Sequence, residues 1–181
     1  MNKSETEGFM AESWMERLQP ADSSAQLPEG ARAQLHQMAA ALRPRLNAVQ
    51  AHPSGNMVLF HGPGGPAKSL AAQALAYELS MPLFRIDLQQ VTNKYIGETE
   101  KNLSAVFASA MTSNAILFFD EADALFGKRT EVKDSHDRYA NIEVNYLTRQ
   151  IKAFRGIVIL ASHQPIPLDC AAGTLDFSIP Q

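Results

Sequence analysis

The residues with the clearest chemical potential are a lysine and a serine behind a glycine-rich turn. Met57 to Phe60 are mostly apolar and predict a buried strand, and an Ala/Leu-rich run predicts a helix from Ser69 to about Leu79. The order strand, glycine loop, Lys-Ser, helix is that of the phosphate-binding loop G-x-x-x-x-G-K-[ST], in which backbone N–H groups hold phosphate, except that Ala67 stands where the last glycine belongs. The residues expected to contact a nucleotide are Gly62, Pro63, Gly64, Gly65, Pro66, Ala67, Lys68, Ser69 and Leu70.

Two further strands are predicted to end in polar residues. The apolar run 116–119 is followed by Asp120 and Glu121, and the run 157–161 is followed by Ser162 and His163. With Lys68 reaching the β- and γ-phosphates, the Ser69 hydroxyl and Asp120 are expected to hold Mg²⁺. Glu121 is expected to orient and activate the attacking water, and His163 to sense the γ-phosphate.

Each of these patterns has an ordinary structural explanation when it stands alone. A Gly/Pro-rich turn before a helix is often only a turn, and an acidic pair after an apolar run is often a solvated strand end. Together, in this order, the patterns predict a P-loop NTPase.

Strands and helices are predicted to alternate along the chain. Residues 83–88 alternate apolar and polar side chains as a strand does, whereas Leu103, Val106, Phe107 and Ala110 have helical spacing. A helix around 35–42 is expected to end or kink at Pro44, another is expected from about Ala140, and a last short strand at 177–179. This alternation predicts an α/β fold with a parallel sheet and helices on both faces, and a ligand site beyond the carboxyl ends of the strands.

Composition excludes several classes of protein. The chain of 181 residues has a net charge of −3, which gives no reason to expect nucleic acid binding. Its apolar runs are too short to cross a membrane, and its polar N-terminus is not a secretory signal, so we expect a cytoplasmic protein. The one cysteine, Cys170, has no accompanying histidine motif, so we interpret it as an inert residue rather than a nucleophile.

The chain divides into an arm and a core by composition. Residues 1–30 contain few apolar residues, and we expect a poorly structured arm with one short amphipathic turn between Phe9 and Leu18. A docking helix for a partner is the alternative for this segment. Residues 31–181 are expected to form the nucleotide-binding domain.

Longer segments resemble one known family. The segment 118–126, Phe-Phe-Asp-Glu-Ala-Asp-Ala-Leu-Phe, closely resembles the Walker B region of AAA+ ATPases of the protein-remodelling and unfolding clade. Residues 94–103 look like the first pore loop and following helix of that clade, and 127–141 look like its second pore loop. The sequence of these segments is particularly similar to that of bacterial members of the family, including those that accompany contractile injection systems.

The resemblance implies a hexameric ring that hydrolyses ATP and pulls a polypeptide through its centre. Tyr95 would be the pore aromatic that grips the substrate; the alternative is a tyrosine that packs on its neighbours. ATP, Mg²⁺, other AAA subunits and a polypeptide substrate are the implied cofactors and partners.

The chain departs from the family pattern in three places. The family has Thr-Gly where this chain has Pro66-Ala67, so one phosphate donor is missing and a Cβ is added close to the phosphates. His163 replaces the family's sensor asparagine. Residues 165–181 contain no arginine or lysine, so the arginine finger, which contributes roughly 10³–10⁵ in rate, is not expected, nor is the helical lid.

These departures leave two principal functional hypotheses. The first is an ATP-binding AAA+ domain with slow hydrolysis at most, which the intact Lys68, Ser69, Asp120 and Glu121 support. The second is a non-catalytic interaction or regulatory subunit, which the altered loop supports. A small-molecule phosphotransferase is less favoured, because no substrate lid or base is apparent.

Overall fold

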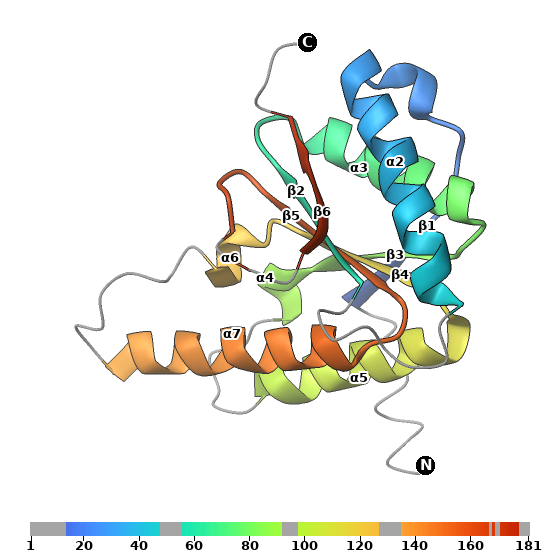
Figure 1. The fold of residues 1–181 in the computed structure, drawn as a ribbon. Coiled ribbons are helices and arrows are strands. Elements are labelled where there is room, and N and C mark those ends of the chain that lie inside the picture. The colour runs from blue at the N-terminus through green and yellow to red at the C-terminus, as the bar shows by residue number, and fades with distance from the viewer. Residues whose placement is uncertain are drawn as a thin grey trace.

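The computed structural model describes residues 14–47, 56–91, 98–126, 135–166, 168 and 171–177. Strands and helices alternate through most of this part of the chain (Figure 1). The strands are β1 (Met15–Leu18), β2 (Met57–His61), β3 (Leu83–Asp87), β4 (Ile116–Asp120), β5 (Ile157–Ser162) and β6 (Ala171–Asp176). The helices are η1 (Ser24–Gln26, a 3-10 turn), α2 (Glu29–Leu46), α3 (Gly65–Leu79), α4 (Leu88–Val91), α5 (Glu98–Ser113), α6 (Asp123–Phe126) and α7 (Ser135–Ala153).

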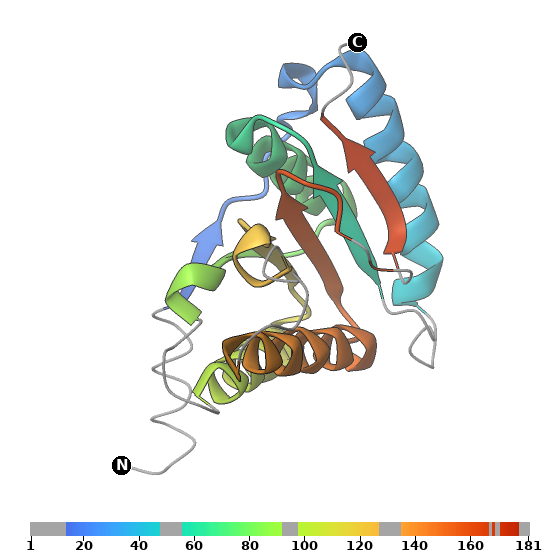
Figure 2. The same ribbon diagram turned by 90° about the vertical axis from the view of Figure 1, so that its left-hand side faces the viewer.

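The strands form one sheet in the order β1-β3-β4-β5-β2-β6. Every neighbouring pair is parallel except β1 and β3, which are antiparallel. Helices α2 and α3 cover one face, and α5 and α7 cover the other (Figures 1 and 2). The predicted α/β class, with a parallel sheet between two layers of helices, is therefore confirmed.

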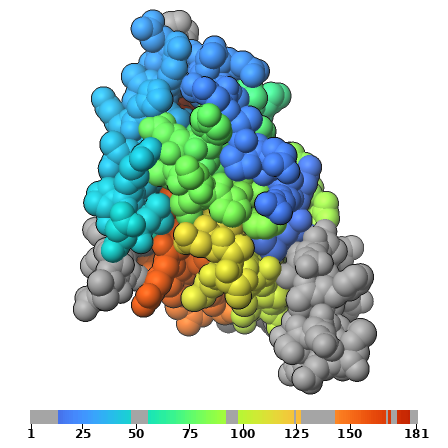
Figure 3. Space-filling view, turned by 90° about the vertical axis from the view of Figure 1, so that its right-hand side faces the viewer, coloured from blue at the N-terminus to red at the C-terminus, as the bar shows by residue number. Residues whose placement is uncertain are grey.

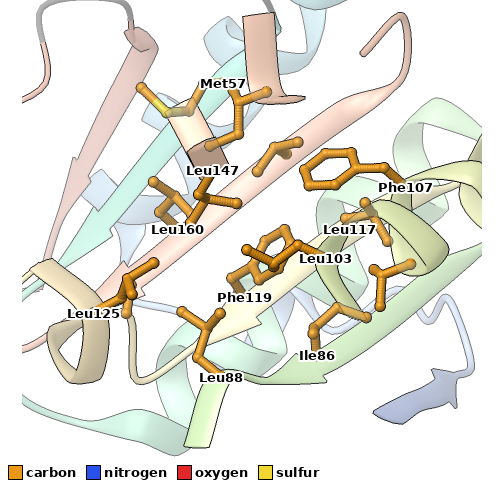
Figure 4. Packing of buried hydrophobic residues seen from close by; sticks show 14 of the residues in the cluster. Met57, Ile86, Leu88, Leu103, Phe107, Leu117, Phe119, Leu125, Leu147 and Leu160 are labelled. Atoms are coloured by element: carbon orange, nitrogen blue, oxygen red, sulfur yellow. The ribbon is translucent and has the colours of Figure 1, made fainter. Parts of the chain in front are cut away.

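The central strands are buried on both faces, which explains their continuous apolar sequence. In β4, Leu117 and Phe119 pack in the cluster under α5 and α7, whereas Ile116 and Phe118 pack in the cluster under α2 and α3. Figure 4 shows the first cluster, in which side chains from the strands meet those from α5 and α7. Burying each of these large side chains stabilises the fold by about 1.5–3 kcal/mol.

The N-terminal segment differs from the expected loose arm over its described part, residues 14–30. Residues 9–13 of the predicted turn lie outside the described residues; Met15–Leu18, its last part, is an edge strand in which Glu16 lies opposite Arg85 of β3 and forms an ion pair with it. Met15 and Leu18 are half-buried against the two core clusters, so this strand places one apolar residue on each side of the sheet edge. Figure 3 shows this segment, in blue, on the surface beside the green residues of the following elements. Of the described helices, none has both the length and the apolar content needed to cross a bilayer.

The bounds of three other elements differ from the predictions. Helix α2 continues through Pro44 to Leu46, because a proline so close to the end removes only one hydrogen bond of the last turns. Helix α7 begins at Ser135 rather than near Ala140. The last described strand is Ala171–Asp176 and ends before Phe177, whereas 178–179 of the predicted strand lie outside the described residues. The small residues of β6 carry little apolar signal, and pairing with β2 defines it. Close packing also favours these small residues, since a Cβ on Gly173 would lie 3.2 Å from the Met38 methyl carbon.

Gly156, in the tight connection between α7 and β5, gives a stability prediction. A Cβ added there would lie 2.7 Å from the Ala115 carbonyl oxygen and 2.5 Å from a ring carbon of Phe154. We expect Gly156→Ala to lower the free energy of unfolding by roughly 1–3 kcal/mol, because the backbone oxygen cannot move aside cheaply. Urea unfolding measures this change. Gly65→Ala is the matched control, since nothing lies within 4 Å of its added Cβ, and an equal loss in both variants would contradict the prediction.

Candidate active site

The carboxyl ends of β2, β4 and β5 meet at one edge of the sheet. Strand β5 lies between the other two, with Ser162 opposite His61 of β2 and Leu160 opposite Phe119 of β4. The residues that follow the three strands therefore come together although they are far apart in sequence. Strand β2 also marks the point where the chain changes direction across the sheet, which is where ligands bind in folds of this class.

Lys68 is buried at this edge, with only 1% of its surface exposed. Its Nζ donates hydrogen bonds to the carbonyl oxygens of Gly62 and Ser162, both at 2.8 Å. Burial lowers the pKa of the Lys68 ammonium, and the nearby carboxylates of Asp120, Asp123 and Glu121 oppose that shift. The predicted phosphate-loop lysine and the predicted Mg²⁺ and water-activating carboxylates thus share one electrostatic environment.

The glycine loop is shorter than the sequence indicates. Gly62 and Gly64 have positive φ angles of 111° and 85°, and helix α3 begins at Gly65, four residues before the predicted start at Ser69. Pro66 lies in the first turn, where its fixed φ suits a helix and its missing N–H costs nothing. The N–H groups of Ala67 and Lys68 both donate to the Gly64 carbonyl oxygen, at 3.1 and 3.3 Å. The correction has a local cause, because proline and alanine favour the first turn of a helix where Thr-Gly would not.

The acidic pair after β4 has an unusual backbone. Glu121 adopts a φ of +50°, and its N–H donates to Oδ1 of Asp120 at 3.0 Å. Its exposed carboxylate accepts a hydrogen bond from the side-chain amide of Gln89, at the start of α4. A non-glycine residue in the left-handed region costs free energy, and such residues cluster at functional sites. Gln89 was not found from the sequence, because only the pairing of β3 with β4 brings it beside Glu121.

Asp123 is a second residue that sequence reasoning missed. Its Oδ2 accepts the His163 N–H at 2.8 Å and lies 3.3 Å from Nδ1 of the same histidine, and its Oδ1 accepts the Gln164 N–H at 3.3 Å. The first residue of α6 thereby fixes the loop that follows β5. The only sequence signal was an acidic residue three positions after Asp120.

The Asp123 carboxyl should make stability depend on pH. Burial alone raises its pKa, but hydrogen bonds from His163 and Gln164 outweigh burial, so the pKa is lowered from 3.8. A carboxyl with a lowered folded pKa contributes stability above its unfolded pKa and loses it as the pH falls through the folded value. We expect Asp123→Asn to lose about 1–2 kcal/mol at pH 7, with the difference from the unsubstituted chain shrinking below about pH 4. Urea unfolding over a pH series checks this; a difference that is constant from pH 7 to pH 3 would contradict it.

The predicted site residues fall into two groups. Lys68, Asp120, Glu121 and His163 lie at the same edge of the sheet, and Ser69 follows Lys68 in the first turns of α3. His163 is 61% exposed at its side chain and contacts Asp123, so its ring is held at the rim of the site. Tyr95 lies outside the described residues, as does the segment 127–134 of the second predicted pore loop, and the side chains of 135–142 are also outside them.

A cleft of about 510 Å³ opens beside the acidic pair. It lies at the carboxyl ends of β3 and β4, and the N-terminal segment forms one wall. Its lining is mostly polar, with four carboxylates and one guanidinium; the lining residues are Trp14, Met15, Glu16, Arg85, Asp87, Gln89, Gln90, Asp120 and Glu121. Water can therefore reach the Glu121 carboxylate from this side.

The donor set fits a nucleotide with Mg²⁺. A buried ammonium, a helix N-terminus and a Ser hydroxyl are the groups that hold phosphate and its metal ion in P-loop sites. The described residues contain no group of three or more His, Cys, Asp or Glu side chains that would hold a metal ion alone. Mg²⁺ in such sites needs none, because it takes one or two protein ligands together with water and phosphate oxygens.

Comparisons with known proteins agree with this geometry. A family model described as "ATPase family associated with various cellular activities (AAA)" matches residues 58–176. The chain is 37% identical over 114 residues to the ATPase family gene 2 protein of Schizosaccharomyces pombe, covering 62% of this chain and 14% of that protein. It is 33% identical over 138 residues to spastin of Anopheles gambiae, covering 72% of this chain and 16% of that protein. The chain therefore spans only a small part of the length of these relatives.

Solved structures give the same fold. The FIGL-1 AAA domain in complex with ADP superimposes with a TM-score of 0.69 at 24% identity, covering all of this chain and 64% of that one. A chain of the Escherichia coli HORMA:CdnC:Trip13 complex gives a TM-score of 0.71 at 20% identity, covering 93% of this chain and 72% of that one. At these identities the likeness concerns the fold.

Proposed function

This chain belongs to the AAA family of ATPases, and from that membership we propose that it binds ATP with Mg²⁺ weakly and hydrolyses it slowly at most. The observation that carries the proposal is the convergence of Lys68, Asp120 and Glu121 at the carboxyl edge of the sheet. The family supplies nucleotide binding, whereas weak affinity and slow turnover are inferred from this chain's own loop.

Each residue has a role in the proposed reaction. Lys68 donates from Nζ to phosphate oxygens, and Ser69 and Asp120 provide oxygen ligands on the metal side. Glu121 accepts the proton of the attacking water at a carboxylate oxygen, and Gln89 orients that carboxylate through its amide. When bound by Ser69 and Asp120, Mg²⁺ would supply positive charge that offsets the charge developing on the phosphate. His163 donates from its ring near the γ-phosphate position, with Asp123 fixing its backbone.

Weak binding follows from the composition of the loop. Pro66 has no N–H, so one donor toward phosphate is lost, and a hydrogen bond to a charged group contributes roughly 1.5–3 kcal/mol. One such loss corresponds to about a ten- to hundredfold weaker affinity. Slow turnover follows from the lack of arginine and lysine over 165–181, the region after β5 where the family carries its finger.

A non-catalytic role as an interaction subunit is the second candidate. The observation that favours it is the early start of α3. The N–H groups of Ala67 and Lys68 donate to the Gly64 carbonyl oxygen, so they are not free to donate to phosphate. A polypeptide or another AAA subunit would then be the partner, and Tyr95 is proposed as the residue that contacts a polypeptide chain. Light scattering with and without ATP tests self-assembly, and nucleotide titration separates the two candidates.

The test is a titration of the full chain with a fluorescent ATP analogue, with and without Mg²⁺, together with steady-state phosphate release. We expect saturable, Mg²⁺-dependent binding weaker than micromolar and turnover near the detection limit. Submicromolar affinity with steady turnover by the isolated chain would contradict the proposal. Binding no stronger than that of Lys68→Ala would favour the interaction subunit instead.

A further inference from the structure

We infer that the phosphate loop of this chain is closed by its own helix, and that Pro66 and Ala67 set nucleotide affinity by stabilising that closed form. The N–H groups of Ala67 and Lys68 donate to the Gly64 carbonyl oxygen, and the Lys68 ammonium donates to the Gly62 carbonyl oxygen. Phosphate binding then requires this turn to open. The inference rests on the proposed function, since it concerns the affinity of the same site.

The backbone N–H groups at the start of α3 show the closure. The first four N–H groups of a helix have no partner within it, and in a phosphate loop such groups face the anion. Here these positions are Gly64, Gly65, Pro66 and Ala67. Pro66 has no N–H, and Ala67 donates to the Gly64 carbonyl oxygen at 3.1 Å. Half of the usual donors are therefore absent or already used.

The local sequence stabilises this turn. Proline in the first turn is already in the helical φ range, and alanine has the most favourable helix propensity. Gly64 precedes the helix with a φ of +85°, a conformation that glycine adopts without strain. The family's Thr-Gly at positions 66 and 67 would remove both advantages, because glycine is among the least favourable residues in a helix.

The Lys68 ammonium connects the start of the loop, at Gly62, to the end of β5, at Ser162. Its bonds to the carbonyl oxygens of Gly62 and Ser162 use two of its three donors and tie the loop to the end of β5. The side chain is 1% exposed, so a phosphate cannot approach Nζ freely from solvent. At least part of this arrangement must rearrange before Lys68 can bind a phosphate oxygen.

If the loop is closed in this way, a substitution in its closing turn that lowers the stability of the protein should raise its affinity for ATP. A substitution that weakens the first turn of α3 destabilises the nucleotide-free protein and lowers the cost of opening the loop. We expect Ala67→Gly to raise ATP affinity about fivefold, because the difference in helix propensity between the two residues corresponds to that factor. The double variant with Pro66→Thr also regains an N–H donor and should exceed tenfold. Both variants should melt about 2–4 °C lower without nucleotide.

The experiment compares both variants with the unsubstituted full chain by titration with the fluorescent ATP analogue, with Mg²⁺, and by thermal unfolding without nucleotide. Gln73→Gly, in the middle of α3 and outside the loop, is the matched control. It should lower the melting temperature similarly without raising affinity. Equal affinities for Ala67→Gly, the double variant and the unsubstituted chain would overturn the inference while leaving weak ATP binding intact.

Hydrogen exchange of individual amides gives a readout that does not depend on ATP binding. In the nucleotide-free chain the amides of Ala67 and Lys68 should exchange slowly, and Ala67→Gly should speed the exchange of the Lys68 amide several-fold. Exchange of both amides at the rate of an unstructured peptide would overturn the closed loop. Slow exchange together with no ATP binding by any variant would support the closed loop and contradict the proposed function.

Discussion

Replacing Lys68 by alanine is expected to weaken ATP binding by about a hundredfold or more. The side chain supplies a charged donor at the point where the loop, α3 and the end of β5 meet. A charge-assisted hydrogen bond from the third donor of Nζ to phosphate contributes roughly 1.5–3 kcal/mol, and the attraction between the ammonium and the phosphate charges is lost with it. Titration with the fluorescent analogue measures it.

Two further substitutions separate charge from packing. Lys68→Met keeps the length of the buried side chain without its charge and should lose as much ATP affinity as Lys68→Ala does. Lys68→Arg keeps the charge and should retain part of the ATP affinity. Circular dichroism and urea unfolding confirm that each variant is folded. Unchanged affinity in Lys68→Ala would show that the analogue binds elsewhere on the surface.

The lowered pKa of Lys68 predicts how binding depends on pH. Because burial disfavours the ammonium, the side chain loses its proton below the ordinary value of 10.5. ATP affinity should therefore decline as the pH rises through the folded pKa, at a lower pH than an exposed lysine would show. Between the folded and unfolded pKa values the unfolded chain binds more protons, so Lys68 makes stability rise with pH there. Titrations between pH 7 and pH 10 on the folded chain measure the decline in affinity.

Phe119→Ala is expected to cost about 3–5 kcal/mol in the free energy of unfolding. Phe119 is fully buried in β4. The centre of its ring lies 5.9 Å from the ring centre of Phe107, and the ring centres of Phe107 and Phe154 are 5.4 Å apart. Figure 4 shows Phe119 beside Leu103 of α5, in the same buried cluster, so that removing the ring would leave a cavity in the core. Domains of this size are commonly stable by only 5–15 kcal/mol, so the variant should lose a large share of its stability.

Urea unfolding followed by circular dichroism measures this loss. Phe119→Leu should cost less, because it leaves a smaller cavity, and Met111→Ala should change stability by less than about 0.5 kcal/mol, since Met111 is 60% exposed. A loss below 1 kcal/mol for Phe119→Ala would mean that the core relaxes around the site. Because Phe119 directly precedes Asp120, ATP binding by the surviving folded fraction should also weaken.

The central strands and the convergence of their polar ends followed from the sequence alone. Met57 to Phe60, 116–119 and 157–161 are apolar on consecutive residues, a pattern that is typical of a strand covered on both faces. The carboxyl ends of parallel strands lie at a common edge of the sheet, so the sequence predicts that Lys68, Asp120 and Ser162 come together there. The family resemblance rested on the segments 118–126, 94–103 and 127–141, and the AAA family is confirmed.

Other features depended on contacts between segments far apart in the chain. Strand β1 contains charged Glu16 and Arg17 and is a strand only because β3 offers a free edge with Arg85 opposite Glu16. Strand β6 is built from small residues and is defined by its pairing with β2. Neither has a local pattern strong enough to identify it.

The fold class, the family and the residue types of the site can be predicted from the chain, because apolar periodicity and motif spacing are local properties. The bonds within the phosphate loop, the hydrogen bonds of Lys68 to the Gly62 and Ser162 carbonyl oxygens, and the contacts of Gln89 and Asp123 come from tertiary contacts. Each of these depends on hydrogen bonds between atoms that several strands bring together. Such bonds cannot be predicted from the spacing of residues within any one segment.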